Sequence, residues 1–504
     1  MFAYKMLRVI LYFSEVFMLF IGIDLGTSSV KLLLMKSGGE ILRTVTEEYP
    51  VYFPQSGWSE QDPEEWFNGT MKGVAKLLDG FDGKEVGGIS FGGQMHGLTP
   101  LDKDGNVIRR AILWNDGRSE EESQYLNNVI GKKKLSAYTG NISFAGFTAP
   151  KVLWMKKNEP ENFAKIDKIL LPKDYLAYRL SGVFATDVSD ASGTLYFDCA
   201  NRKWSAEMLE ILGITEAQLP KVYESYEAIG KIKPEIAEQL GINPDCLIVA
   251  GAGDNAAAAV GTGTVGNGGC NISLGTSGTI FIASSNFKND EDNSLHAFDH
   301  ADGGYHLMGC MLSAASCNKW WMEDIIGTKD FAAEQTGITT LGENNIFFLP
   351  YLMGERSPLN NPECRAMFIG MSMDTKREEM TQAVLEGVAF ALRDSFECAK
   401  KMGLDIKSSN ICGGGAKSPL WRKIVANVLG IELTRTQNDE GPALGGAILA
   451  AVACGEYKNV EEACKAIVTT HVAETPDPEL TAKYEAKYQK FSKLYPMCKE
   501  AGLW

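Results

Sequence analysis

One short pattern occurs twice in this chain and limits the fold more than any other feature. The first copy spans residues 21–31, Ile-Gly-Ile-Asp-Leu-Gly-Thr-Ser-Ser-Val-Lys, and the second spans residues 271–279, Asn-Ile-Ser-Leu-Gly-Thr-Ser-Gly-Thr. Each copy reads as an apolar strand, a tight Gly-Thr-Ser turn and a returning strand. Glycine lets a ligand approach the backbone closely, and the adjoining hydroxyl and N–H groups can bind phosphate oxygens. One copy in each half therefore predicts a duplicated α/β fold that holds a nucleotide from both sides.

The size, charge and cysteine content of the chain limit its class. Its 504 residues exceed the size at which a single core usually stops growing, which predicts two domains. A formal net charge of −15 argues against nucleic-acid binding, which needs a basic surface, but an anionic ligand can still bind in a cleft of opposite local field. The eleven cysteines are odd in number and lack Cys-x-x-Cys spacing. This favours reduced thiols in a cytoplasmic protein over disulfides or a zinc site.

The residues before the first loop read as a separate segment. Residues 1–17 are largely apolar, but Glu15 interrupts the run and no small-residue cleavage site precedes Ile21. The uninterrupted apolar stretch is also too short to span a bilayer. We therefore expect no signal peptide and no membrane association, with translation starting at Met18 and residues 1–17 forming a dispensable extension.

Helices and strands alternate through the first half, as in an α/β sheet. A helix is expected from Asp62-Pro63, where an aspartate caps the helix and proline takes its first position. The apolar runs at residues 86–91 and 246–250 read as strands, and each ends at a polar or glycine-rich group.

The second half continues the same alternation. Residues 379–396 carry a helical apolar stripe, and further helices are expected after Ser418 and from Pro442. The glycines between residues 263 and 269 suit a hinge. We therefore predict an N-terminal domain over residues 18–264 and a C-terminal domain over residues 265–504.

Two aspartates stand where phosphoryl transfer needs carboxylates. Asp24 lies within the first loop, where it can organise Mg²⁺ beside phosphates, and the alternative is a turn residue bonded to its own backbone. Asp254 follows the strand 246–250 and opens an Ala-rich helix, so it can accept a proton from a substrate hydroxyl at the carboxyl end of the sheet. The alternative for Asp254 is a helix N-cap.

Three further groups are candidates for binding. The run Gly413, Gly414 and Gly415 precedes a helix and can face a nucleoside, or it is a plain strand-to-helix turn; it is neither a Walker loop nor a dinucleotide fingerprint. Met95 and His96 follow a strand end, although a lone histidine is more often structural. The cluster of Trp114, Asn115, Asp116 and Arg118 suits a polyhydroxylated substrate, but Asp116 and Arg118 can equally form a surface ion pair.

These residues resemble the FGGY carbohydrate kinases, and among them most closely the xylulokinases. The resemblance runs from about residue 18 to about residue 451. The motifs that carry it lie at residues 22–28, 58–63, 93–97, 112–118, 146–151, 171–176, 253–257, 273–278, 312–317, 348–356, 384–388 and 413–416.

The resemblance implies two actin-like, ribonuclease-H-like ATPase domains that flank a central cleft binding Mg-ATP and a sugar. It implies that Asp254 is the catalytic base and Asp24 the metal-associated carboxylate. The expected sugar contacts are Met95, His96, Trp114, Asn115, Asp116 and Asn255. The expected nucleotide contacts are Gly26, Thr27, Ser28, Lys31, Gly275, Thr276, Ser277, Gly413, Gly414 and Gly415.

The reaction implied by the resemblance is the ATP-dependent phosphorylation of D-xylulose to D-xylulose 5-phosphate. One alternative is a related kinase acting on ribulose, gluconate, erythritol or glycerol. The other is an actin-like nucleotide-binding protein without sugar chemistry. A homodimer is the family expectation for assembly.

Overall fold

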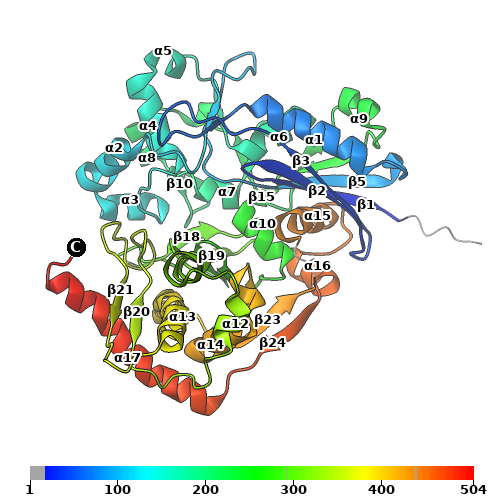
Figure 1. Ribbon diagram of the computed structural model, residues 1–504. Helices are drawn as coiled ribbons and strands as arrows, with labels where there is room; N and C mark the ends of the chain where they lie inside the picture. Colours follow the sequence, from blue (N-terminus) through cyan, green and yellow to red (C-terminus); the bar gives the residue numbers. More distant parts are fainter. Residues whose placement is uncertain (1–16, 291, 438–439) are drawn as a thin grey trace, which may run out of the picture.

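Two lobes, each built around a twisted mixed sheet, make up the protein (Figure 1). The computed structural model describes residues 17–290, 292–437 and 440–504. The expected extension over residues 1–17 therefore lies, apart from Phe17, outside the described residues.

The first sheet has the strand order β13-β14-β5-β1-β2-β3, with β15 also paired to β5. Its hairpin strands β1, β2 and β3 are antiparallel, whereas β5 and β14 run parallel to β1. The bounds are β1 Leu19–Leu25, β2 Ser29–Lys36, β3 Ile41–Glu48, β5 Val86–Gly93, β13 Ala228–Lys231, β14 Leu247–Val249 and β15 Ala252–Gly253.

The second sheet repeats this plan in the order β18-β19-β17-β16-β22-β23-β24. Here β16, β17 and β19 form the antiparallel part, and β22 and β23 run parallel to β16. The bounds are β16 Cys270–Leu274, β17 Gly278–Ser284, β18 His296–Asp299, β19 Tyr305–Met311, β22 Ser408–Cys412, β23 Glu432–Thr436 and β24 Thr470–Glu474.

The two Gly-Thr-Ser loops occupy equivalent places in these sheets. The first joins β1 to β2, where Leu25 pairs with Val30, and the second joins β16 to β17, where Leu274 pairs with Gly278. The prediction of a duplicated α/β fold from the two loops is therefore confirmed.

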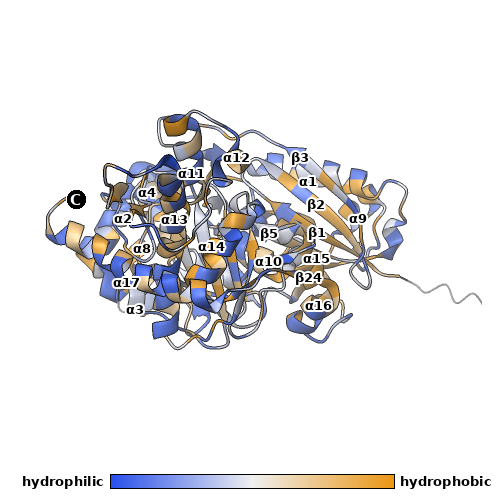
Figure 2. Cartoon of the chain, turned by 60° about the horizontal axis from the view of Figure 1, so that its bottom comes forward, coloured by the Kyte–Doolittle hydropathy of each residue, from blue (hydrophilic) through white to orange (hydrophobic). Residues whose placement is uncertain are grey.

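Helices cover both sheets and also form an insertion in the first lobe. Apolar residues concentrate in β1, β2 and β5, where helices cover the sheet (Figure 2). The helices of the first lobe are α1 Pro63–Leu77, α2 Glu120–Tyr125, α3 Lys132–Thr139, α4 Thr148–Asn158, α5 Pro160–Phe163, α6 Pro172–Ser181, α7 Val188–Ser192, α8 Ala206–Leu212, α9 Pro234–Leu240 and α10 Asp254–Gly261. Those that follow are α11 Ala315–Lys319, α12 Phe331–Gln335, α13 Arg377–Lys401, α14 Pro419–Leu429, α15 Gly441–Ala453, α16 Val460–Ile467 and α17 Pro478–Glu500.

Shorter strands pair outside the two main sheets. They are β4 Glu60–Gln61 with β7 Ala111–Ile112, β6 Thr99–Leu101 with β8 Lys168–Leu170, β9 Ala185–Asp187 with β12 Lys221–Tyr223, β10 Phe197–Asp198 with β11 Lys203–Trp204, and β20 Phe347–Leu349 with β21 Met367–Ile369.

The helices predicted from a capping residue or from an apolar stripe are confirmed. Asp62 caps α1 by accepting from the Glu64 N–H, and Ser418 caps α14 by accepting from the Trp421 N–H. Helix α13 contains the whole predicted stripe at residues 379–396. Asp254, by contrast, is the first residue of α10 after Gly253, so it does not act as the N-cap.

Helix α15 comes from the second half of the sequence but packs against the first sheet. It lies against β1, β5 and α10, and a hydrophobic cluster joins Phe20 and Leu33 of the sheet to Leu444 and Ile448 of the helix. Figure 1 shows α10 and α15 side by side between the two sheets. Residues 262–269 connect α10 to β16, and the predicted domain boundary between residues 264 and 265 falls in this link and stays a prediction.

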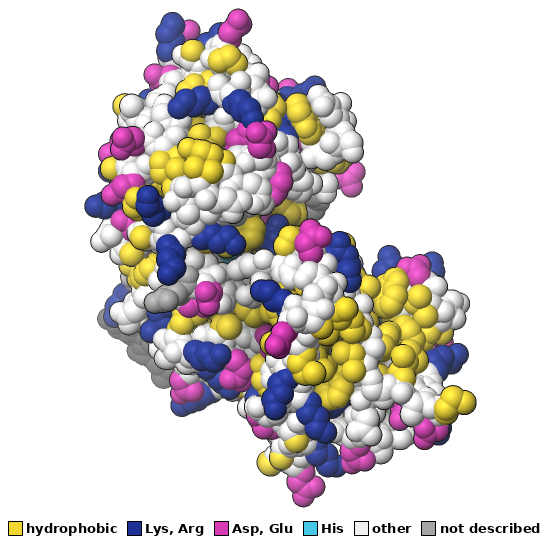
Figure 3. All heavy atoms as spheres, turned by 90° about the vertical axis from the view of Figure 1, so that its left-hand side faces the viewer, with side chains coloured by type: hydrophobic (Ala, Val, Ile, Leu, Met, Phe, Trp, Pro, Cys, Tyr) yellow, Lys and Arg dark blue, Asp and Glu magenta, His cyan; other side chains and the backbone are white. Residues whose placement is uncertain are grey.

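Exposed large apolar side chains of the second half are Ile325, Met353, Met371, Met373, Val472, Met497 and Leu503. Figure 3 shows hydrophobic side chains gathered on the lower part of one face of the molecule. The homodimer stays a prediction. No helix within the described ranges combines the length and apolar character needed to cross a bilayer.

Candidate active site

The two predicted catalytic aspartates lie at the carboxyl end of the first sheet. Asp24 is near the end of β1, beside Gly92 of β5, and Asp254 follows β15, which pairs with the same end of β5. Burial, with a smaller effect of the nearby Asp254 charge, raises the pKa of Asp24 to about 7. Burial also raises the pKa of Asp254 to about 6. The fold thus brings two carboxylates into one poorly solvated site.

Asn255 fixes one oxygen of Asp254 and leaves the other available. Both the backbone N–H and the Nδ2 of Asn255 donate to Asp254 Oδ1, at 2.7 and 3.0 Å. Among the described residues, none donates to Asp254 Oδ2. A carboxylate held this way has a fixed orientation and a free oxygen that can accept a proton.

Met95 and His96 lie next to this aspartate. The Met95 Sδ is 3.9 Å from Asn255 Nδ2, and the His96 Nδ1 lies 2.7 Å from the Gly193 carbonyl oxygen. Since a carbonyl can only accept, Nδ1 carries the proton and Nε2 is an acceptor in the neutral ring. Burial, with a smaller effect of the Lys151 charge, lowers the pKa of His96 to about 3, so the ring is neutral at physiological pH. His96 can therefore accept a hydrogen bond from a sugar hydroxyl through Nε2.

The backbone around His96 is also held in place. His96 has a φ of 68°, which is uncommon for a residue with a side chain. Its carbonyl accepts from Thr148 Oγ1 at 3.1 Å and from the buried Lys151 Nζ at 2.9 Å. Its ring lies 4.7 Å from that of Phe147. These contacts maintain a strained conformation at the candidate sugar site.

The Trp114 cluster divides between surface and interior. Trp114 is half exposed and donates from Nε1 to Thr27 Oγ1 at 3.0 Å, and Asn115 is exposed. Asp116 is buried and accepts from the Ser59 N–H at 2.5 Å while pairing with Arg118 at 2.8 Å. This ion pair is fully buried, so the alternative of a surface pair is wrong. Asp116 holds the loop from within, and its contact with a substrate stays a prediction.

Hydrogen bonds to its carbonyl groups hold the first Gly-Thr-Ser loop in place. Tyr49 Oη donates to the Gly26 carbonyl and Gln61 Nε2 donates to the Thr27 carbonyl, both at 2.5 Å. The Ser28 carbonyl accepts from the Tyr49 N–H at 3.2 Å. Carbonyls engaged in this way cannot point at an anion.

Lys31 lies on β2, one strand from Asp24. It pairs in register with Asp24 in the hairpin, and its Nζ forms an ion pair with Glu440 at 3.0 Å. Glu440 directly precedes α15, so the pair connects the first loop to the start of that helix. A role for Lys31 at the phosphates stays a prediction.

The second loop is anchored to helix α11. The Gly275 carbonyl accepts from the Ala315 N–H at 2.8 Å, and the Thr276 carbonyl accepts from the Ala314 N–H at 3.0 Å. Ser277 stands at the tip of the hairpin, before Gly278 begins β17. Contacts of these three residues with phosphate stay predictions.

A pocket of ≈ 570 Å³ lies between α10, the second sheet and the start of α15. This volume is typical of small-molecule sites. The predicted residues Asn255, Gly413 and Gly414 line it, whereas Gly415 packs inward against Trp421 and Leu274. The remaining lining residues are Ala258, Ala259, Thr262, Asn271, Ser273, Thr279, Phe281, Cys412, Lys417, Arg435, Thr436, Gly441 and Pro442.

Most of the residues that line this pocket were not predicted from the sequence. Arg435 and Thr436 end β23, and strand ends at this edge of an α/β sheet are a known signal for ligand contacts. Pro442 was predicted only as the start of a helix, and no role was predicted for Gly441. Their place in the pocket depends on the packing of α15 against α10, which local patterns do not reveal.

Gly413 is expected to be essential for the shape of this pocket. It has a φ of +89°, and an added Cβ would lie 2.6 Å from the Leu274 carbonyl atoms. We expect Gly413→Ala to raise the KM for ATP about tenfold, since a side chain in the left-handed region costs ~1–2 kcal/mol. Steady-state kinetics at varied ATP would measure this.

Gly414→Ala is the matched control. Gly414 has a φ of −61°, and an added Cβ has no atom within 4 Å. This variant should keep the wild-type Tm, whereas Gly413→Ala should lower it. Equal Tm and equal KM for ATP in both variants would contradict the assignment of Gly413.

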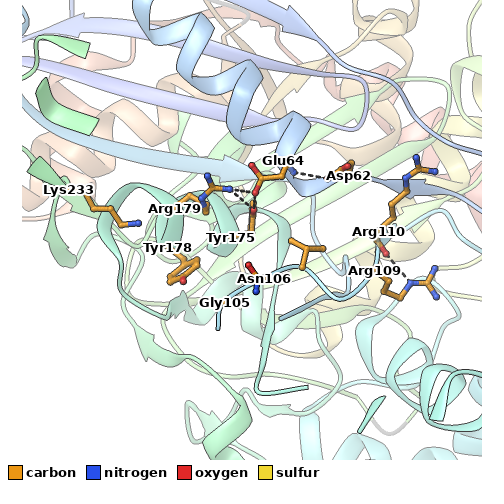
Figure 4. A pocket seen from close by; sticks show the side chains of 11 residues that line it. Asp62, Glu64, Gly105, Asn106, Arg109, Arg110, Tyr175, Tyr178, Arg179 and Lys233 are labelled. Atoms are coloured by element: carbon orange, nitrogen blue, oxygen red, sulfur yellow. Dashed lines mark hydrogen bonds and ion pairs between the residues drawn. The ribbon is translucent and has the colours of Figure 1, made fainter. Parts of the chain in front are cut away.

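A second hollow lies on the outer side of the first lobe, around α1 and α6 (Figure 4). It shares no residue with the pocket at Gly413. Figure 4 shows Glu64 pointing toward Tyr175 and Arg179, with which it interacts. Arg109 in turn pairs with Glu60 and Glu159. The main charges here are thus satisfied within the protein, and the hollow lacks the paired aspartates of the site above.

Comparison with known proteins agrees with this geometry. The N-terminal domain of the FGGY family of carbohydrate kinases matches residues 19–261, and its C-terminal domain matches residues 270–454. The chain belongs to the FGGY family of carbohydrate kinases. It is therefore a sugar kinase with the two-domain actin-like ATPase fold, and family membership implies ATP as a substrate.

Individual FGGY kinases are similar over almost the whole chain. The xylulose kinase of Escherichia coli K12 is 41% identical over 481 residues, covering 95% of this chain and 98% of its own. A "xyloylose kinase" from Brucella ovis has a similar crystal structure, with a TM-score of 0.91 and 38% identity over 96% of this chain and 100% of its own. A gluconate kinase from Lactobacillus acidophilus gives a TM-score of 0.90 and 28% identity, over 96% and 98%.

Proposed function

We propose that this FGGY kinase transfers the γ-phosphoryl group of ATP to the C5 hydroxyl of D-xylulose, giving D-xylulose 5-phosphate and ADP. The observation that carries the proposal is the position of Asn255. This residue bonds Asp254, contacts Met95 and lines the pocket at Gly413. Asp254 thus lies between the candidate sugar site and the candidate nucleotide site. The xylulose kinase of E. coli, at 41% identity, supports the choice of sugar.

In the proposed mechanism, the sugar binds against Met95 and His96 with a hydroxyl directed at Asp254. Asp254 Oδ2 accepts the proton of that hydroxyl while the hydroxyl oxygen bonds to the γ-phosphorus. At the same time the bond from the γ-phosphorus to the ADP oxygen breaks. The Gly275 N–H of the second loop stabilises charge on the phosphate oxygens, whereas the Gly26 N–H already donates to the Ser29 carbonyl at 3.0 Å. His96 Nε2 accepts from a second sugar hydroxyl and fixes the orientation.

The residues present fit a magnesium ion at Asp24. Its carboxylate accepts no hydrogen bond from another side chain in the described part of the chain, and Mg²⁺ is commonly held by one or two carboxylates together with substrate phosphates. When bound, Mg²⁺ supplies positive charge against the phosphates during transfer. Asp24 would hold it, and Lys31 on the adjacent strand would limit the repulsion between Asp24 and the nucleotide.

We also propose a cytoplasmic location for this reaction. The chain has eleven cysteines, an odd number without Cys-x-x-Cys spacing. Cysteines in this number and pattern suit a reducing compartment, where ATP is also available.

An ADP-release assay over several sugars tests the proposed substrate. We expect D-xylulose to give a kcat/KM at least about tenfold above those of ribulose, gluconate, erythritol and glycerol, which is the discrimination that a few pocket contacts supply. A higher kcat/KM with gluconate would reassign the enzyme to that sugar acid. Absence of stimulation by every sugar would reject the kinase reaction.

A further inference from the structure

Helix α7 is a short buried helix that contacts both parts of the candidate active site. It spans Val188–Ser192, and Asp187 caps it by accepting from the Ser189 and Asp190 N–H groups. Every residue of the helix is buried. No role was predicted for this segment from the sequence.

The N-terminal end of α7 holds the peptide just before Asp254. The Gly253 N–H donates to Ser189 Oγ at 3.1 Å, and Ser189 Oγ donates to Asp187 Oδ2 at 2.5 Å. An ionised carboxylate can only accept, so the hydroxyl hydrogen points to Asp187. The lone pairs of Ser189 Oγ are then directed away from Asp187 and face Gly253. Asp187 thus sets the direction in which Ser189 accepts.

Asp187 is itself held by a buried cation. Its Oδ1 is 2.8 Å from Lys173 Nζ, and both side chains are fully buried. Lys173 Nζ also lies 2.6 Å from Asp174 and 3.6 Å from Asp190. Charges buried together in this way have little freedom to reorient, because any movement would leave one of them unpaired.

The C-terminal end of α7 holds the histidine of the sugar site. The Gly193 carbonyl directly follows the helix and accepts from His96 Nδ1 at 2.7 Å. An added Cβ on Gly193 would lie 2.6 Å from the His96 ring and 2.9 Å from Met95 Cε, so the helix end is in close contact with both sugar-site residues. One five-residue helix therefore connects the group that orients the sugar to the group that deprotonates it.

We propose that Asp187 and Ser189 are positioning residues for phosphoryl transfer, which fix Asp254 through the Gly253 peptide and, through α7, set its position relative to His96. The proposal rests on the proposed role of Asp254 as the base. In this proposal α7 sets the relative positions of Asp254 and His96 and does not itself contact the reacting atoms. Positioning of this kind has large effects, because a displacement of about 1 Å can lower a rate by about a hundredfold.

Two buried serines provide a matched test. Ser189 Oγ and Ser225 Oγ both donate to Asp187 Oδ2, at 2.5 and 2.6 Å, and both residues are fully buried. Only Ser189 also accepts from Gly253. Ser189→Ala and Ser225→Ala therefore each remove one donor to Asp187, but only the first also removes the acceptor from the peptide before Asp254.

We expect Ser189→Ala to lower kcat by about ten- to a hundredfold, with the KM values for sugar and ATP within about threefold of wild type. Ser225→Ala should lower Tm to a similar extent, with a loss of kcat below about threefold. Asp187→Asn, if it folds, should both lower kcat and raise the KM for sugar, since both ends of α7 depend on it. Equal losses of kcat in the two serine variants would overturn the proposal, because a merely structural role predicts equality.

A different result would contradict the proposed substrate. The wild-type enzyme would then prefer another sugar, and the kcat values of Ser189→Ala and Ser225→Ala would be compared on that sugar. If Asp254→Asn retained wild-type kcat, the role of the base would fail whatever the result for Ser189.

Discussion

Asp254→Asn is expected to lower kcat by about 10²- to 10⁴-fold, the range typical of losing a general base. The amide keeps the size of the side chain but cannot accept the proton of the attacking hydroxyl. Binding of ATP should change little, because Asp254 is not among the residues that line the pocket at Gly413. Single-turnover ADP release and a separate ATP-binding titration would measure the two effects.

Asp394→Asn is the matched control for this variant. Asp394 is a partly buried carboxylate in α13 that accepts from Tyr488 Oη at 2.7 Å, away from both candidate sites. It should retain a kcat within about threefold of wild type. If the two variants had similar kcat values, Asp254 would not be the base.

The pH dependence follows from the same group. Burial raises the pKa of Asp254 to about 6, and the base acts only when ionised. The rate should therefore fall about tenfold per pH unit below this value, with bound cations moving the midpoint lower. A profile of kcat/KM from pH 5 to pH 8 would show this limb, and the residual activity of Asp254→Asn should lack it.

A large loss of stability is expected from Gly445→Ala in α15. An added Cβ would lie 1.9 Å from the Ala257 carbonyl oxygen of α10, which is rigid helical backbone. Alanine would otherwise favour a helix by about 1 kcal/mol relative to glycine. Here the steric conflict dominates, and forcing the two helices apart should cost at least about 3 kcal/mol. Chemical denaturation followed by circular dichroism would measure the loss.

Gly441→Ala in the same helix is the control for stability. Its added Cβ would have Ala258 as nearest neighbour at 3.7 Å, which is ordinary contact. Its stability should remain within about 0.5 kcal/mol of wild type. If Gly445→Ala were equally stable, the close packing of α15 on α10 would be wrong.

The predictable part of the molecule was the part encoded by local patterns. The loops at Gly26 and Gly275 can be predicted from the sequence because a tight turn between apolar strands needs particular residues. The capped starts of α1 and α14 follow from Asp62 and Ser418 for the same reason. The position of Asp254 at the edge of the sheet could be predicted, because a polar residue at the end of an apolar strand lies where α/β sheets bind ligands.

The rest depends on contacts between distant segments. Ser189 and Gly253 are 64 positions apart, and no sequence pattern around either residue predicts their hydrogen bond. A surface ion pair was one of the two interpretations of Asp116, because a short polar stretch usually lies on the surface, whereas the fold buries it with Arg118. Arg435 and Thr436 reach the pocket only because β23 lies beside β22 in the second sheet. Such features require the tertiary structure.

The packing of α15 on the first sheet has a consequence for synthesis of the chain. Phe20, Leu33 and Met35 share a hydrophobic cluster with residues of α15 and α16, as late as Cys464. A growing chain therefore cannot complete its first lobe when residue 264 leaves the ribosome. That lobe must wait for nearly all of the second half with an apolar face uncovered, although domains usually fold in order from the N-terminus. The two halves of this kinase are duplicated in plan, yet the first half completes its apolar core only with helices from the second.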